Sequence, residues 1–185
     1  CTFTDNSARR AGGALFVRRN LAAEIDSDFS GNKCYGAIDG TQVAGGAIFV
    51  GDDYTGIIGG SSFAGNLARN YDGSNDGIPR AAGGALHVGG NFFASQVKDC
   101  VFNDNQAVPF NEAENNTSIS SGGAIHIVGN AETAFTECHF NRNAAYGYSS
   151  EGGAIAILGY LQSSEGSGFQ GCEFNQNLAR RAGGA

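Results

Sequence analysis

The sequence opens with CTFTDNSARRAGGA at residues 1–14, and CEFNQNLARRAGGA at residues 172–185 repeats ten of these fourteen positions. Two phrases make up the shared pattern. The first, F-x-x-N-x-A with one Cys in the Ala slot, recurs along the chain and has its Asn at Asn6, Asn32, Asn66, Asn105, Asn143 and Asn177. The second, Gly-Gly-Ala, begins at Gly12, Gly45, Gly83, Gly122, Gly152 and Gly183, at intervals of 30 to 39 residues. Self-similarity at such a period predicts a solenoid.

Alternating residues after each Gly-Gly-Ala favour strand over helix. Two columns are uniformly aliphatic: Leu15/Val17, Ile48/Val50, Leu86/Val88, Ile125/Ile127 and Ile155/Ile157. Between them lies a mixed column of Phe16, Phe49, His87, His126 and Ala156. Period two predicts strands whose uniform columns face the core and whose mixed column faces outward. We therefore expect an all-β fold, a right-handed parallel β-helix of pectin-lyase-like architecture with two or three strands in each coil.

The repeated Asn and Gly residues are expected at the corners of the coils. An Asn side chain in a corner can bond turn backbone groups and the Asn one coil away, and Asn tolerates left-handed backbone angles. The alternative is a solvated turn residue with no such ladder. Paired glycines suit a tight corner, where a Cβ would clash with a neighbouring backbone.

The two ends of the sequence carry the same phase of the same coil. We therefore expect residues 1–185 to form a single β-helix segment, an uncapped slice of a longer array that joins neighbouring copies or flanking coils end to end.

Charge and hydropathy exclude two classes of partner. The formal net charge is −7, and the only lysines are Lys33 and Lys98. Such a surface lacks the cations that neutralise phosphates, so we expect no nucleic-acid partner. Anionic membrane surfaces are disfavoured for the same reason. Since no apolar run approaches the ~20 residues of a membrane span, we expect no membrane insertion.

The coupled F-x-x-N and G-G-A-[I/L/V] phrases resemble the repeats of the chlamydial polymorphic outer-membrane proteins, which are similar to autotransporter passengers. The same repeat type occurs in extracellular proteins of algae and protists. The resemblance covers the whole chain. It implies a right-handed β-helix located outside the cell or on its surface and associated with adhesion.

Five cysteines and three histidines are the first candidates for chemistry. Four cysteines occupy one column, two residues before the repeat Phe: Cys1, Cys100, Cys138 and Cys172. Ser27 and Ser61 fill this slot in the other coils, which indicates that the column needs a small side chain. Vertically stacked parallel strands seldom give the dihedral angle of a disulfide, which favours buried free thiols over disulfide staples between coils. His87 and His126 are expected about 5 Å apart on neighbouring strands, in an apolar surface stripe or an incomplete metal site. His139 is isolated.

The acidic residues are the candidates for a metal site or a catalytic site. The stretch YDGSNDG at residues 71–77 imitates the start of a calcium loop through Asp72, Ser74 and Asp76, but Gly83 stands where the loop needs a Glu. Polysaccharide lyases and hydrolases share the β-helix scaffold, and their chemistry needs carboxylates that project together. Because the mixed column supplies no acid, we assign no catalytic residue, no metal ligand and no cofactor, and we expect a non-enzymatic protein.

The variable arc between the Asn and the Gly-Gly-Ala is the expected place of partner binding. Its loops, residues 35–44, 69–82, 108–121 and 146–151, would protrude side by side and carry Tyr35, Tyr71, Phe110, Tyr146 and Tyr148. These aromatic residues either contact a protein or glycan partner or fold back on the coil. Overlapping sequons at Asn115 and Asn116 would be glycosylated in a eukaryotic secretory setting.

These observations predict an extracellular or cell-surface structural and adhesive segment, such as a stalk, a filament or a surface array, that presents a loop face to its partners. The alternative is a β-helix that binds or cleaves carbohydrate.

Overall fold

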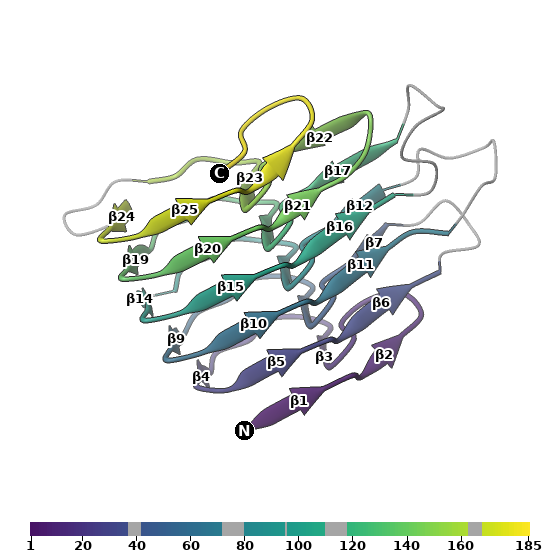
Figure 1. The fold of residues 1–185 in the computed structure, drawn as a ribbon. Helices are drawn as coiled ribbons and strands as arrows, with labels where there is room; N and C mark the ends of the chain where they lie inside the picture. Colours follow the sequence, from purple (N-terminus) through teal and green to yellow (C-terminus); the bar gives the residue numbers. More distant parts are fainter. Residues whose placement is uncertain (37–41, 72–79, 95, 110–117, 163–167) are drawn as a thin grey trace.

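The computed structural model describes residues 1–36, 42–71, 80–94, 96–109, 118–162 and 168–185. The described elements are all β-strands, and the coils stack from the N-terminus at the bottom of Figure 1 to the last strands at the top. Every strand pairs in parallel with the strand one coil away, for example β10 with β5. The chain is a right-handed parallel β-helix, as the repeat predicts.

Five parallel sheets run the length of the β-helix, and a coil passes through them in the order 1, 2, 3, 4, 5. Sheet 1 contains β1 (Thr2–Thr4), β5 (Asp28–Ser30), β10 (Ser62–Ala64), β15 (Val101–Asn103), β20 (His139–Asn141) and β25 (Glu173–Asn175). Sheet 2 contains β2 (Ser7–Ala8), β6 (Lys33–Tyr35), β11 (Leu67–Arg69), β16 (Gln106–Val108), β21 (Ala144–Ala145) and β26 (Leu178–Ala179). Sheet 3 contains β7 (Val43–Ala44), β12 (Arg80–Ala82), β17 (Ile119–Ser121) and β22 (Ser149–Glu151). Sheet 4 contains β3 (Leu15–Val17), β8 (Ile48–Val50), β13 (Leu86–Val88), β18 (Ile125–Ile127) and β23 (Ile155–Ile157). Sheet 5 contains β4 (Glu24–Ile25), β9 (Ile57–Gly59), β14 (Gln96–Lys98), β19 (Ala134–Thr136) and β24 (Gly168–Gln170).

A complete coil therefore has five strands, where the sequence predicts two or three. The strands are only two or three residues long because corners interrupt the extended chain at short intervals. Many of these corners contain a residue with positive φ, such as Gly65 between β10 and β11 and Gly83 between β12 and β13.

The main core lies between sheets 1, 4 and 5. Register places like residues over one another, so Phe63 pairs with Phe29 below it and with Phe102 above it. The centroids of the Phe63 and Phe102 rings are 4.7 Å apart, which is the ordinary spacing of strands in a sheet. The two aliphatic columns of sheet 4 point into the same core, as the period-two pattern predicts.

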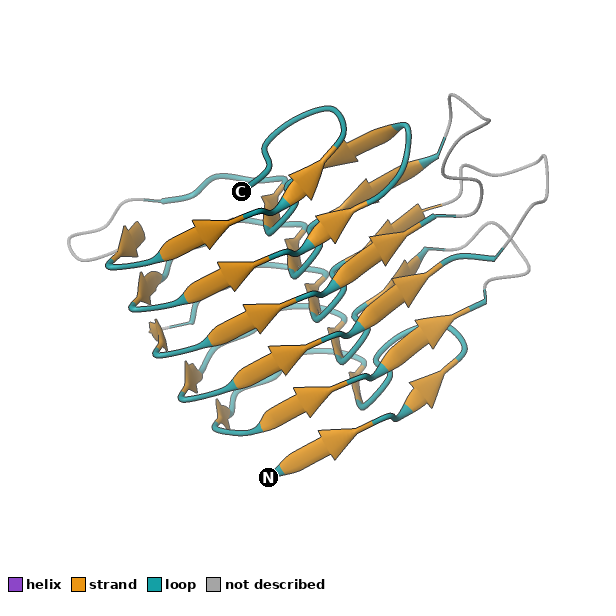
Figure 2. Cartoon of the chain, in the orientation of Figure 1, coloured by secondary structure: helices purple, strands orange, loops and turns teal. Residues whose placement is uncertain are grey.

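Sheets 2 and 3 pack against each other and extend to one side of the main core, and sheet 3 lies behind sheet 2 in Figure 2. Their contact contains Cys34, Ala68 and Val43, which form a small separate cluster. The narrow space between the two sheets explains why the F-x-x-N-x-A phrase ends in a small residue.

The paired glycines form the corner between sheets 3 and 4. Gly83 has a φ of 57°, and an added Cβ would overlap the backbone of Leu86. A Cβ on Gly84 would overlap the carbonyl oxygen of Gly123 in the next coil and the backbone nitrogen of Gln106 in sheet 2. This geometry confirms the tight corner expected from the sequence.

Among the described residues there is no helix with the length and hydropathy of a membrane span.

Candidate functional site

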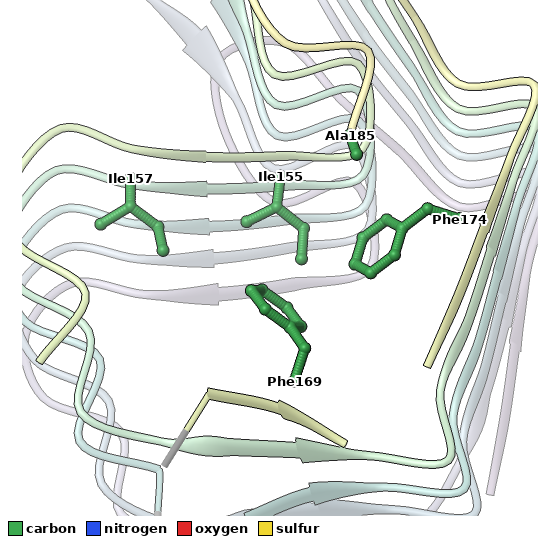
Figure 3. A pocket seen from close by; sticks show the side chains of 5 residues that line it. All are labelled: Ile155, Ile157, Phe169, Phe174 and Ala185. Atoms are coloured by element: carbon green, nitrogen blue, oxygen red, sulfur yellow. The ribbon is translucent and has the colours of Figure 1, made fainter. Parts of the chain in front are cut away.

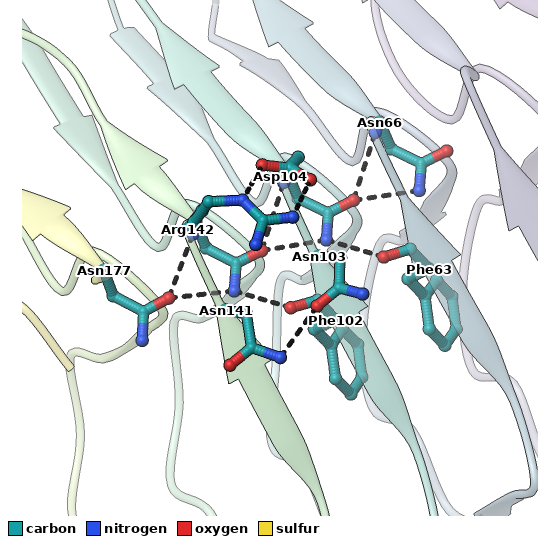
Figure 4. Close-up of polar contacts among 10 residues, drawn as sticks. Phe63, Asn66, Phe102, Asn103, Asp104, Asn141, Arg142 and Asn177 are labelled. Atoms are coloured by element: carbon teal, nitrogen blue, oxygen red, sulfur yellow. Dashed lines mark hydrogen bonds and ion pairs between the residues drawn. The ribbon is translucent and has the colours of Figure 1, made fainter. Parts of the chain in front are cut away.

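The six repeat asparagines form one continuous ladder at the corner between sheets 1 and 2. Each side-chain oxygen from Asn32 onward accepts hydrogen bonds from the backbone N–H and the Nδ2 of the asparagine one coil earlier, at 2.9–3.1 Å. Each Nδ2 from Asn32 onward also donates to the carbonyl of the repeat Phe in the coil before, as Asn105 does to Phe63 at 2.9 Å. Figure 4 shows the ladder running from Asn66 to Asn177. The side chains thus link the coils where the backbone turns.

The left-handed conformation at this corner belongs to the residue before each asparagine and not to the asparagine itself. The residues with positive φ are Asp5, Gly31, Gly65, Asp104, Arg142 and Gln176. Asn tolerates such angles, but none of the six repeat asparagines adopts them. The asparagine is needed for its side-chain amide, which carries both a donor and an acceptor. The left-handed turn at the preceding residue orients this amide along the axis of the β-helix.

A second polar ladder, which sequence analysis missed, follows sheet 4. Its members lie three residues after the second aliphatic residue of the strand: Asn20, Asp53, Asn91 and Asn130. Asn91 donates its backbone N–H to Asp53 Oδ1, and Asn130 donates to Asn91 Oδ1. The residues that directly follow the ladder members form a column of side chains of different sizes, and its members Tyr54 and Phe92 are buried. The fixed three-residue offset was the signal for this ladder, although its residue types vary.

The aromatic edge, which we define as Tyr35, Tyr71, Tyr146 and Tyr148, lies where sheet 2 passes into sheet 3. The rings of Tyr35 and Tyr71 meet edge to face with centroids 6.0 Å apart, and the guanidinium of Arg69 lies 5.1 Å from the centroid of Tyr71. Tyr35, Tyr71 and Tyr148 are exposed, at 39%, 51% and 46%.

Tyr146 and Tyr148 belong to a later coil of the same edge. The guanidinium of Arg180 lies 5.6 Å from the Tyr148 centroid. Tyr146 is half-buried, its backbone N–H donates to Ala107, and its carbonyl accepts from Ser120. Tyr146 is therefore the one described member of the edge that turns partly back onto the coil.

Some expected site residues fall on parts of the chain outside the described residues. These are Phe110, the sequon residues Asn115 and Asn116, and the calcium-like residues Asp72, Ser74 and Asp76. Gly83, at the position of the missing calcium-loop Glu, is described and forms the Gly-Gly corner.

The five cysteines are free thiols. Cys100 Sγ donates to the carbonyls of Ile58 and Lys98, and Ser61 Oγ donates to the two matching carbonyls, Ile25 and Gly59. A thiol and a hydroxyl therefore make the same bonds in this column, which explains why either Cys or Ser can fill it. Burial raises the pKa of Cys34 to about 12, so this thiol stays protonated at neutral pH.

The structure places His87 and His126 side by side, but they do not form the exposed stripe that the sequence predicts. Each side chain is only 3% exposed, because each ring is stacked in a column, with His87 between Phe49 and His126. The two Nδ1 atoms are 3.0 Å apart, so one imidazole donates to the other. Burial lowers the pKa of His126 to about 4, and burial together with its neighbour lowers the pKa of His87. Both rings are therefore neutral at pH 7.

The outer face of sheet 1 carries polar side chains that pair between coils. His139 Nδ1 lies 3.2 Å from Glu173 Oε2, so His139 is not isolated as the sequence suggested. Asn141 Nδ2 donates to Asn103 Oδ1 at 3.0 Å. Arg142 forms a two-pronged ion pair with Asp104 beside this column (Figure 4). This face offers amide, imidazole and carboxylate groups to solvent.

The described residues contain no group of three or more His, Cys, Asp or Glu side chains that could hold a metal ion. The buried His87–His126 pair, which the sequence offers as an incomplete metal site, supplies two nitrogen ligands and is closed to solvent.

Comparison with known proteins gives one match. No curated protein and no solved structure matches the chain significantly. The family model of the Chlamydia polymorphic membrane protein repeat matches residues 1–18, which contain the first F-x-x-N-x-A phrase, the first Gly-Gly-Ala and the strand β3. Residues 1–18 are therefore similar to a Chlamydia polymorphic membrane protein repeat, and the structure stacks further copies of the same two phrases directly upon them.

Proposed function

We propose that residues 1–185 act as a non-enzymatic scaffold outside the cell or on its surface, whose rigid coils hold the aromatic edge in position for a protein or glycan partner. The observation that carries the proposal is the asparagine ladder, which links all six coils on one side of the β-helix. Such a body resists bending between coils because each coil bonds to the next through backbone and side chain.

The aromatic edge supports a role in contact with partners. Tyr35, Tyr71 and Tyr148 expose phenol rings, and the guanidinium groups of Arg69 and Arg180 contact the rings of Tyr71 and Tyr148 by cation–π interactions. Exposed Tyr next to Arg is the composition of binding hot spots, because both side chains combine apolar area with hydrogen-bond donors. Rings fixed on a rigid support also lose little conformational entropy on binding.

The similarity of residues 1–18 to a Chlamydia polymorphic membrane protein repeat supports the location at the cell surface and the adhesin-like role. The net charge of −7 favours partners that do not rely on phosphate groups.

A binding screen with matched variants tests this proposal. The chain is applied to a printed glycan array and to immobilised extracellular-matrix proteins, and each ligand found is titrated against Tyr71→Ala and Tyr148→Ala. We expect each substitution to weaken binding by about tenfold or more, since a hot-spot Tyr that the partner buries contributes about 2 kcal/mol or more. The control is Tyr160→Ala, whose ring is 79% exposed and follows sheet 4 at another corner. Equal affinity of all three variants and the parent would refute the assignment of the edge.

A second candidate function, binding or cleavage of polysaccharide, is favoured by the outer face of sheet 1. The His139–Glu173 pair and the Asn103–Asn141 column offer the hydrogen-bonding groups that sugars need. Incubation with acidic polysaccharides such as polygalacturonate, with and without calcium, distinguishes the two functions. Release of new reducing ends that is lost in Glu173→Gln would replace the scaffold proposal with an enzymatic one.

A further inference from the structure

The inside of the β-helix offers a ligand only hydrocarbon side chains at the level that Figure 3 shows. Ile155, Ile157, Phe169 and Phe174 come from sheets 4, 5 and 1 and point toward one another. None of these side chains carries a charge or a hydrogen-bonding group. A polar ligand would therefore bind to an outer face, and the charges on the outer faces differ from sheet to sheet.

Sheet 2 presents cations on its outer face. Cys34 and Ala68 are buried in the contact between sheets 2 and 3, so the residues beside them on β6 and β11 point outward. Lys33 and Arg69 are two of these outward residues, and both are exposed. All strands of sheet 2 are described, and none of them contains an acidic residue.

Sheets 1 and 5 carry acids on their outer faces. Asp28 and Glu173 are exposed on sheet 1, and Glu24 is exposed on sheet 5. At physiological ionic strength the Debye length is about 8 Å, so a ligand on sheet 2 responds mainly to the charges of that face. Asp39 and Asp72, which follow strands of sheet 2 in the sequence, lie outside the described residues. The salt dependence of binding measures the sign of the charge that a ligand meets on this face.

The cations of sheet 2 lie next to exposed rings. Register places Tyr35 opposite Arg69 on the neighbouring strand, and Lys33 points outward two residues before Tyr35. The guanidinium of Arg69 lies 5.1 Å from the centroid of Tyr71, whose ring meets that of Tyr35 edge to face. Within the described residues, neither Lys33 nor Arg69 forms an ion pair. Both charges can therefore pair with an anion on a surface that also offers two phenol rings.

A second pair of the same kind lies farther along the axis. The guanidinium of Arg180 lies 5.6 Å from the centroid of Tyr148, and the strand before Arg180, β26, belongs to the same sheet as β11. A small ligand needs one such pair, whereas pairs repeated along one edge suit a chain molecule that binds at several points. Neighbouring coils are about 4.8 Å apart, which is close to the length of one sugar unit in an extended polysaccharide.

We propose that the outer face of sheet 2 and the aromatic edge bind an acidic polysaccharide, whose carboxylate or sulfate groups pair with Lys33 and Arg69 and whose sugar rings pack on Tyr35 and Tyr71. The inference rests on the proposed function, because it names the partner of the aromatic edge. Guanidinium groups bind carboxylates and other oxyanions by charge-assisted hydrogen bonds. The apolar body of a Tyr ring packs on the C–H face of a sugar while its hydroxyl bonds to the sugar hydroxyls. An acidic protein segment would use the cations but offers no repeated sugar faces to the rings.

Binding to polymers of matched length tests the proposal. Residues 1–185 are titrated with heparin, polygalacturonate, neutral dextran and polyglutamate at about 0.01 M and about 0.15 M salt, where the Debye length is about 30 Å and about 8 Å. The site variants are Lys33→Gln and Arg69→Gln. Each has a control with the same change elsewhere, Lys98→Gln in sheet 5 and Arg18→Gln after sheet 4. All four side chains are exposed, so the fold is expected to survive, and circular dichroism checks it.

We expect binding to at least one of the two acidic polysaccharides and none to dextran, with an affinity that falls by about tenfold between the two salt concentrations. Arg69→Gln should weaken binding by about tenfold and Lys33→Gln by about threefold, whereas both controls should stay within about twofold of the parent. Three results would each overturn the proposal: no binding to either acidic polysaccharide at low salt, equal effects of the site and control variants, or equal affinity for polyglutamate.

The failure of this proposal and the failure of the proposed function give different results. A ligand whose binding is weakened by Tyr71→Ala but not by Arg69→Gln would keep the aromatic edge as a contact surface and overturn the assignment of an acidic polysaccharide. Equal affinity of Tyr71→Ala and the parent for every ligand would refute the aromatic edge itself, and the acidic polysaccharide with it.

Discussion

Replacement of Asn105 by Ala measures what one step of the asparagine ladder contributes to stability. Asn105 is fully buried and makes five side-chain or ladder bonds, of which Ala retains only its own backbone N–H to Asn143. Four bonds are lost: two from Asn66 to Asn105 Oδ1, and two from Asn105 Nδ2 to Phe63 and Asn143. The backbone N–H and one amide hydrogen of Asn66 are then left buried without an acceptor.

Each stranded donor costs about 1–3 kcal/mol, so we expect Asn105→Ala to lower the free energy of unfolding by about 4 kcal/mol. Urea unfolding followed by circular dichroism measures this, with an unchanged m-value showing that the folded state is still compact. The matched control is Asn6→Ala at the exposed first step, which loses only the Nδ2 bond to Asn32 and should cost less than about 1 kcal/mol. If both substitutions cost the same small amount, the ladder does not hold the coils together and the reasoning is wrong.

Three further outcomes are expected. Gly84→Ala should prevent folding to a soluble β protein, since the added Cβ would overlap two backbone segments. The control Gly59→Ala, whose Cβ would meet only a side-chain methyl at 3.9 Å, should fold normally. Soluble expression and circular dichroism measure whether each variant folds. Acid should destabilise the fold through His126, because burial lowers the pKa of this side chain from 6.5 to about 4 in the folded state. The contribution of His126 to the free energy of unfolding is therefore complete above pH 6.5 and is lost as the pH falls from 6.5 to 4. The total loss is about 3 kcal/mol. Unfolding midpoints of the parent, measured across this range, should show the loss. The double variant His87→Phe/His126→Phe, which continues the Phe column, should keep the same midpoint across the range. Equal pH profiles of the parent and the double variant would contradict the burial of the pair. Cys100→Ser should change the stability by less than about 1 kcal/mol, because Ser61 already makes the same two bonds; a large loss in urea unfolding would mean that the thiol has a role that hydroxyl bonding does not supply.

The stacking of the coils could be predicted from the sequence because the interactions are between like residues. The repeat Phe residues are in register with one another, as Phe63 is with Phe29 and Phe102, and the same holds for the aliphatic columns. In a solenoid, a residue's main neighbour is the residue at the same phase of the next coil. Periodicity alone therefore fixes the contacts between like residues of successive coils.

Other features depend on contacts between different phases of the coil, and periodicity is silent about these. Sheets 2 and 3 pack on each other, and this could not be inferred from short runs of Ala and Ser such as those around Ala68 and Ser120. The burial of His87 and His126 was missed because period two says which side of the strand they share but not what covers it. The second polar ladder was missed because Asp53 and Asn91 differ in type, although they share a fixed offset from the strand.

The candidate binding edge was only partly accessible to prediction. The sequence located Tyr35 and Tyr71 on neighbouring loops, and the structure brings their rings into contact. The pairing of Arg180 with Tyr148 joins residues 32 positions apart in different coils, and nothing in the local pattern indicated it.

Amide hydrogen exchange at the ladder asparagines tests the central claim most directly. The backbone N–H groups of Asn32, Asn66 and Asn105 donate to the side-chain oxygen of the next coil and are fully buried. We predict that these amides exchange only through global unfolding, with protection equal to that of the most stable core strands. Exchange of these amides at the rate of exposed loops would show that the coils are not joined by the ladder, and the account of a rigid stacked scaffold would fail.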